Sequence, residues 1–270
     1  MMGYAAIIAA RFKALLQYRA AALGGLFTQI FFGLVRVMIL RAFYAAATTA
    51  APMSLPSVTG YVWLGQAMLL LIPWREDTDV AEQIRTGTVV YELTKPIDLW
   101  GVWFARSLAW RTAPVFLRMI PMFVFAMLIL PAVAPGWGLA PPPSAAAFAL
   151  WIGCFAGAVM VSAALTALIN VSMMWTLTGE GVPMLLAAFA TMFGGLVIPL
   201  PLFPDWLKPA LYALPFAGIL DFPSRVFTGN LSIAEGGLVL AHQLAWTLAL
   251  AAAGRYFLAR GLRRLVVQGG

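Results

Sequence analysis

Charged residues are scarce in this sequence of 270 residues: only 10% are Asp, Glu, Lys or Arg, while 63% are hydrophobic. Soluble domains carry about 25% charged residues, with which they cover their surface. The composition therefore indicates a membrane protein. The excess of 17 Lys and Arg over 10 Asp and Glu does not then point to a nucleic-acid partner, because basic residues of membrane proteins concentrate on the cytoplasmic side.

Residues that carry chemistry are also scarce. The single cysteine, Cys154, has no partner for an internal disulfide and lies in an apolar run, which is typical of packing. The single histidine, His242, has no second ligand near it in the sequence, so no metal site is predicted. No P-loop motif and no intramembrane carboxylate pair occur, which argues against an ATPase, an intramembrane enzyme and a proton-coupled carrier. No catalytic residue and no cofactor are expected in this chain.

Long apolar runs dominate what is present. A spanning helix needs about 20 mainly apolar residues, because the hydrocarbon core of a bilayer is about 30 Å thick. The sequence predicts an all-α membrane protein in which residues 1–20 precede a transmembrane domain at 21–270. Its six transmembrane helices are predicted at residues 21–43, 57–74, 112–133, 145–175, 182–199 and 236–258.

The distribution of Lys and Arg predicts the orientation. Twelve of the 17 lie on one side, in the N-terminal segment, in the loop 75–111 and in the C-terminal tail. Basic loops face the cytoplasm, so both termini are expected there, as an even number of spans requires.

Two polar residues inside the spans are candidates for a translocation path. Arg36 lies deeper than Arg41 and Arg118, whose side chains can reach the interface. It faces a wet cavity or pairs inside the bundle, unless the first span is shifted along the chain. His242, in the sixth span, is either a satisfied histidine or one that lines the path.

Residues 1–20 are predicted to form a helix that lies in the cytoplasmic interface. On the opposite side from Lys13, apolar residues repeat at helical spacing, at Ile8, Phe12, Leu15 and Leu16. The alternative is a simple extension of the first spanning helix.

A second short helix is predicted in the loop after the second span. The residues from Asp79 to Glu82 have the form of a capping box, and Gly87 suits the end of the helix. About two turns cannot hold alone in water, so the helix must dock. Its apolar pair, Val80 and Ile84, either packs on its own chain or contacts a soluble partner.

A proline-rich segment follows the fifth span and begins with Pro199, Pro201 and Phe203. Its apolar run at 211–220 is too short to cross a bilayer, so an outer re-entrant or interfacial segment is expected. Such a backbone is tolerated only where protein covers it or water reaches it. The segment is either a passive cap or an exit gate formed by the three residues at its start.

Several stretches resemble one family. D-V-A-E-Q-I-R-T-G at 79–87 and L-T-K-P at 93–96 are similar to a signature in the first cytoplasmic loop of type-two ABC exporter permeases. Residues 194–206 and 214–216 are similar to the fifth span and exit loop of the six-span bacterial subgroup. The basic tail at 260–270, which ends in Gly-Gly, is similar to the C-terminus of that subgroup.

The resemblance implies the permease subunit of an ABC exporter in the bacterial cytoplasmic (inner) membrane. It implies two copies of a cytoplasmic ABC ATPase, which bind ATP and Mg²⁺, and a homodimer or a heterodimer with a sister permease. The short loop helix corresponds by position to a coupling helix that contacts the ATPase, with residues Asp79, Val80, Glu82, Ile84 and Arg85.

The apolar bundle favours a hydrophobic, amphipathic or cationic substrate, as in multidrug efflux, or a membrane lipid. The competing hypothesis is an ATP-independent carrier or channel. Such a protein would need coupling residues inside its spans, and the sequence has few of them.

Overall fold

The computed structural model describes residues 2–48, 50–176 and 181–263. These residues form helices, turns and loops and no strand, so the prediction of an all-α protein is confirmed. The predicted tail beyond Arg263 lies outside the described residues. Four helices are long and apolar enough to cross a membrane: α2 (Arg19–Ala46), the continuous helix Leu99–Val133, α8 (Ala145–Ser172) and α12 (Ile233–Leu262).

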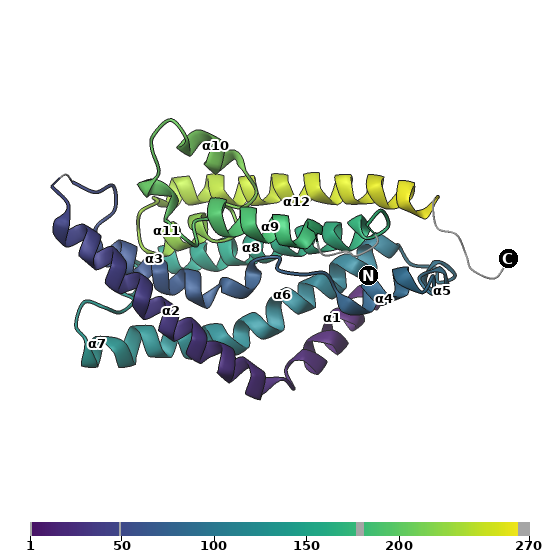
Figure 1. Ribbon diagram of the computed structural model, residues 1–270, viewed down its shortest axis with the longest axis horizontal. Helices are drawn as coiled ribbons and strands as arrows, with labels where there is room; N and C mark the ends of the chain where they lie inside the picture. Colours follow the sequence, from purple (N-terminus) through teal and green to yellow (C-terminus); the bar gives the residue numbers. More distant parts are fainter. Residues whose placement is uncertain (1, 49, 177–180, 264–270) are drawn as a thin grey trace.

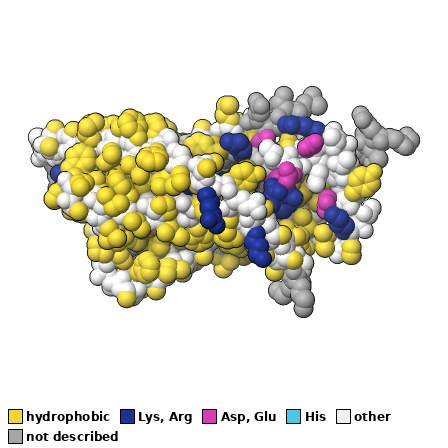
Figure 2. All heavy atoms as spheres, turned by 90° about the horizontal axis from the view of Figure 1, so that it is seen from below, with side chains coloured by type: hydrophobic (Ala, Val, Ile, Leu, Met, Phe, Trp, Pro, Cys, Tyr) yellow, Lys and Arg dark blue, Asp and Glu magenta, His cyan; other side chains and the backbone are white. Residues whose placement is uncertain are grey.

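The molecule is elongated, and most of its described charged side chains lie toward one end (Figures 1 and 2). The short helices α4 (Thr78–Arg85) and α5 (Val90–Leu93) lie there, near the last turns of α12 (Figure 1). The short helix α1 (Met2–Leu15) packs on the helix that begins at Leu99. Figure 2 shows Lys, Arg, Asp and Glu over this part and a mostly hydrophobic surface over the rest of the same face. We call the part that holds α4 and α5 the charged end.

The third predicted span belongs to a much longer helix. This helix consists of α6 (Leu99–Val124), a π-helical turn at Phe125–Ile129 and α7 (Leu130–Val133). Asp98 caps its start by accepting a hydrogen bond from Gly101 N at 2.9 Å. The prediction of a loop up to residue 111 is therefore wrong. The π-helical turn ends beside Pro131, which has no N–H for the regular ladder.

The second and fifth predicted spans contain shorter helices than expected. The helix α3 (Leu55–Ala67) has 13 residues and is followed by a 3-10 turn at Leu69–Leu71, and α9 (Gly181–Phe193) also has 13. A helix of that length is about 20 Å long, less than the hydrocarbon thickness. Ten of the 13 residues of α3 are buried, so this helix lies inside the bundle.

The proline-rich segment folds back against the bundle. It contains a 3-10 turn at Leu200–Leu202, then α10 (Lys208–Ala213) and α11 (Asp221–Phe227), and α11 packs on α3 and α8. Residues 215–224 are buried, so protein covers this irregular backbone. Asp221, fully buried, accepts hydrogen bonds from Tyr61 Oη at 2.7 Å and Leu200 N at 3.2 Å, and lies 3.4 Å from Arg225 Nη1.

Glycines bring the long helices together at two places. Gly157 of α8 faces Gln243 of α12, whose Nε2 donates to the carbonyl of Cys154 at 2.8 Å and to that of Gly218 at 2.7 Å. Near the charged end, Gly254 of α12 lies directly against the indole of Trp100 on α6. A methyl group at either glycine would overlap the side chain that faces it.

Gly254→Ala should therefore destabilise the bundle by about 1–3 kcal/mol, the usual cost of overpacking a well-packed interior. The measurement is thermal unfolding of the purified protein in detergent. Gly237→Ala in the same helix is the matched control, because nothing lies within 4 Å of a Cβ at that position. Equal melting temperatures for the two variants would contradict the packing described here.

Candidate functional site

The start of α4 is fixed by Asp77. This residue is the N-cap of α4, and its Oδ1 accepts a hydrogen bond from Asp79 N at 3.1 Å. Its own N–H donates to Asn170 Oδ1 of α8 at 2.9 Å. The predicted capping box between Asp79 and Glu82 is therefore wrong, whereas the predicted end of the helix is confirmed: Gly87 follows it with φ +74°.

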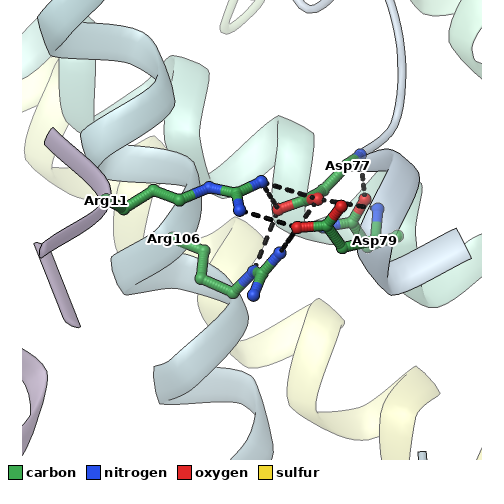
Figure 3. Close-up of polar contacts among 5 residues, drawn as sticks. Arg11, Asp77, Asp79 and Arg106 are labelled. Atoms are coloured by element: carbon green, nitrogen blue, oxygen red, sulfur yellow. Dashed lines mark hydrogen bonds and ion pairs between the residues drawn. The ribbon is translucent and has the colours of Figure 1, made fainter. Parts of the chain in front are cut away.

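Two arginines from other helices pair with the two carboxylates at this N-terminus (Figure 3). Arg11 of α1 lies 2.6 Å from Asp79 Oδ2 and 3.2 Å from Asp77 Oδ1. Arg106 of α6 lies 3.0 Å from Asp77 Oδ2 and 2.8 Å from Asp79 Oδ2. We call Arg11, Asp77, Asp79 and Arg106 the ion-pair cluster. Its two positive and two negative charges join α1, α4 and α6.

Asp77 and Asp79 differ in exposure within this cluster. The Asp77 side chain is 3% exposed, whereas that of Asp79 is 52% exposed. The hydrogen bond from Arg11, together with that from Arg106, holds the pKa of Asp79 below its ordinary value of 3.8 despite partial desolvation. The contribution of Asp79 to stability is thus present above pH 3.8 and is lost only as the pH falls below that value.

The apolar face of α4 packs against its own chain. Val80 is fully buried in a cluster with Trp100, Trp103 and other residues of α6, α8 and α12, and Ile84 packs against the same cluster. Of the two predicted roles for this apolar pair, the structure shows packing on the chain itself. Glu82 and Arg85 lie on the exposed face of α4.

A stripe of three polar side chains on α8 faces the segment that joins α3 to α4, and two of them bond to it directly. Ser162, Thr166 and Asn170 follow one another at intervals of four residues and lie on one face of the helix. Ser162 donates to the carbonyl of Leu71, and Asn170 accepts from Asp77 N. The stripe was not among the predicted site residues, although the sequence carries a signal for it: three polar residues at helical spacing in a largely apolar run.

Arg111 of α6 completes this attachment. Its side chain is buried, and its Nη1 donates to the carbonyls of Leu70 and Ile72 at 3.0 and 2.9 Å, while its Nε donates to Thr166 Oγ1 at 3.0 Å. The last carbonyls of a helix lack partners within the helix and carry its partial negative charge. The Arg111 guanidinium therefore satisfies carbonyls at the end of the 3-10 turn that follows α3, and no carboxylate of the described residues pairs with it.

Comparison of the sequence with known protein families identifies the class of this protein. The family model that describes ABC-2 family transporter proteins matches residues 30–269. The chain belongs to the ABC-2 family. Comparisons with curated proteins and with solved structures give no match.

Membership in the ABC-2 family makes the chain the non-catalytic transmembrane subunit of an ABC transporter, with an ABC ATPase as its partner. The resemblance seen in the sequence is thereby confirmed. The four long apolar helices agree with a multi-pass subunit of this kind.

The other predicted site residues of this ABC-2 subunit lie away from α4. Arg36 of α2 is half-buried and donates from Nη1 to the carbonyl of Leu196 at 2.9 Å, so it bonds inside the bundle. His242 of α12 lies between the rings of Phe222 and Trp246, with centroids 5.3 and 6.5 Å away. The structure places Arg36 and His242 in separate surroundings.

The three residues of the predicted exit gate pack at the start of the proline-rich segment. Pro199 and Pro201 are buried and Phe203 is half-buried. The backbone N–H of Leu200, between the two prolines, is bound by Asp221, which also binds Tyr61 of α3. Sequence analysis missed the pairing of Asp221 with Tyr61, because nothing in the spacing links residues 160 positions apart.

Asp77→Ala should loosen α4 and α1 together, because it removes the N-cap and leaves Arg106 without its buried partner. The expected loss of stability is on the order of 3 kcal/mol, with faster hydrogen exchange of the amides of both helices. Asp205→Ala is the control, since Asp205 pairs with Lys208 alone among the described residues and its side chain is 97% exposed. Unchanged exchange in α4 would contradict the capping role of Asp77.

Proposed function

We propose that this ABC-2 subunit is the permease of an ATP-driven exporter and works as a dimer, with itself or with a sister permease. Two copies of the ABC ATPase bind at the charged end, where they hold ATP and Mg²⁺. The helices α3 and α9 belong to the second and fifth of six membrane crossings. In each of these crossings, the irregular chain that follows the helix spans the rest of the membrane. The charged end is cytoplasmic, as the distribution of Lys and Arg favours, with both termini on that side of the inner membrane.

The observation that carries the proposal is the way in which α4 is held. The ion-pair cluster and the buried Val80 fix α4 to the permease, while Glu82 and Arg85 remain on its exposed face. We assign α4 as the coupling helix. Among the residues expected to contact the ATPase, Glu82 and Arg85 form the contact surface, whereas Asp79, Val80 and Ile84 attach the helix.

The contacts of α3 favour a mechanical route from α4 to the opposite end. The segment between α3 and α4 is bonded to α8 and Arg111, so a displacement of α4 strains the end of α3. The middle of α3 carries Tyr61, which binds Asp221 beside Leu200. ATP-driven closure of the two ATPases would thus move the exit gate at Pro199, Pro201 and Phe203.

The substrate class follows from the apolar character of the bundle. A hydrophobic, amphipathic or cationic compound, of the kind handled in multidrug efflux, or a lipid fits walls with few polar groups. Arg36 and His242 are the polar residues that we propose for the translocation path. The alternative function is an ATP-independent carrier or channel, in which α4 would be only a structural element.

Purification of a tagged permease in mild detergent, from cells that express the native gene neighbourhood, tests the class of transporter. We expect a soluble subunit with a P-loop to co-elute in stoichiometric amount, and mass spectrometry identifies every chain. A second permease in the eluate would show a heterodimer. A stable permease without any such ATPase would favour the carrier or channel.

The contact surface on α4 is tested by charge reversal. Glu82→Lys combined with Arg85→Glu should weaken retention of the ATPase by about tenfold or more, equivalent to about 1.4 kcal/mol. The matched control reverses an ion pair on the far side of the molecule, with Asp205→Lys and Lys208→Asp. If both double variants retain the ATPase equally, α4 does not form the contact.

A further inference from the structure

A cavity of about 790 Å³ lies between the last turns of α8, the first turn of α9 and the last turns of α12. Its walls are largely apolar and include Val171, Leu186 and the rings of Trp175 and Phe257. These two rings pack edge to face with centroids 6.2 Å apart. The cavity therefore offers an apolar chamber beside the charged end.

Two arginines, Arg260 and Arg263, line the same cavity, and no Asp or Glu is among its described lining residues. Arg260 lies over the ring of Tyr256, 4.6 Å from its centroid, and both arginines are exposed. Within the described part of the chain, neither arginine forms an ion pair with a carboxylate, unlike Arg255, which pairs with Asp98 at 3.2 Å. Among the described residues, the cavity thus joins two arginines without a carboxylate partner to an apolar interior.

We propose that this cavity binds an anionic phospholipid from the leaflet at the charged end. Guanidinium groups bind phosphate oxygens with charge-assisted, often bidentate hydrogen bonds. Basic pockets between transmembrane helices on the cytoplasmic side are suited to anionic headgroups. An acyl chain would fill the apolar walls, which a free phosphate ion would leave empty.

The position of the cavity links the lipid to the support of α4. Val171 lines the cavity and also belongs to the apolar cluster that buries Val80. A bound acyl chain packs against α8 from the side opposite to α4 and so stiffens the helix on which α4 rests. The site is distinct from the ATPase contact, and lipid binding can be measured on the permease alone.

The test uses native mass spectrometry of the purified permease after incubation with mixed micelles that contain either phosphatidylglycerol or phosphatidylcholine. The wild-type protein should retain one phosphatidylglycerol per chain and little phosphatidylcholine. Arg260→Gln with Arg263→Gln should reduce phosphatidylglycerol retention by about tenfold or more. Lys13→Gln with Arg19→Gln removes the same charge from exposed residues outside the cavity and should leave retention unchanged.

A second variant tests the apolar part of the site. Val182→Trp fills the cavity without a change of charge, and we expect it to lose phosphatidylglycerol as well. If the double arginine variant fails to fold, Val182→Trp is sufficient to test the proposal. Soluble glycerophosphoglycerol, which has the headgroup but no chains, should not displace the lipid.

Any of the following outcomes would overturn the proposal: equal retention by the double arginine variant, equal losses in both double variants, equal binding of phosphatidylcholine, or full retention in Val182→Trp. Displacement by the soluble headgroup at lipid-like concentrations would show a simple anion site and would also overturn it.

Discussion

The buried residue Asp77 contacts four helices, α1, α4, α6 and α8. Its carboxylate caps α4 and pairs with arginines of α1 and α6, while its N–H bonds to α8. A buried carboxylate is tolerated only where its charge is neutralised and hydrogen-bonded, and each of these contacts contributes to that condition. The position of α4 relative to the bundle therefore depends on Asp77, and with it the surface that this ABC-2 subunit offers to an ATPase.

Inside the bundle, the backbone groups at the ends of interrupted helices also need polar partners. Backbone groups freed at a helix end inside a membrane protein must find partners within the protein. Arg111 and Ser162 satisfy the carbonyls after α3, and Asp221 satisfies the N–H of Leu200 at the opposite end. These three polar side chains thus lie where the helices break.

The long helices could be predicted from the sequence because hydropathy follows their length, and α2, α8 and α12 begin and end close to the expected residues. The start of α6 could not be predicted, because Arg106 and Arg111 suggest a solvent-exposed loop unless their distant partners are known. The existence of α4 was predictable from its end at Gly87, but two carboxylates could serve as its N-cap. The hydrogen bond from Asp77 N to Asn170, which is distant in the sequence, distinguishes Asp77 from Asp79.

The ion-pair cluster also bears on how the chain is made. Arg11 precedes Asp77 by 66 residues, and Asn170 follows it by 93. During synthesis, α1 leaves the ribosome long before its partner carboxylates, and Asp77 receives its last hydrogen bond only after most of α8 has been translated. The charged end is therefore assembled late, and a chain that stops before α8 would expose an unfinished cluster to quality-control proteases.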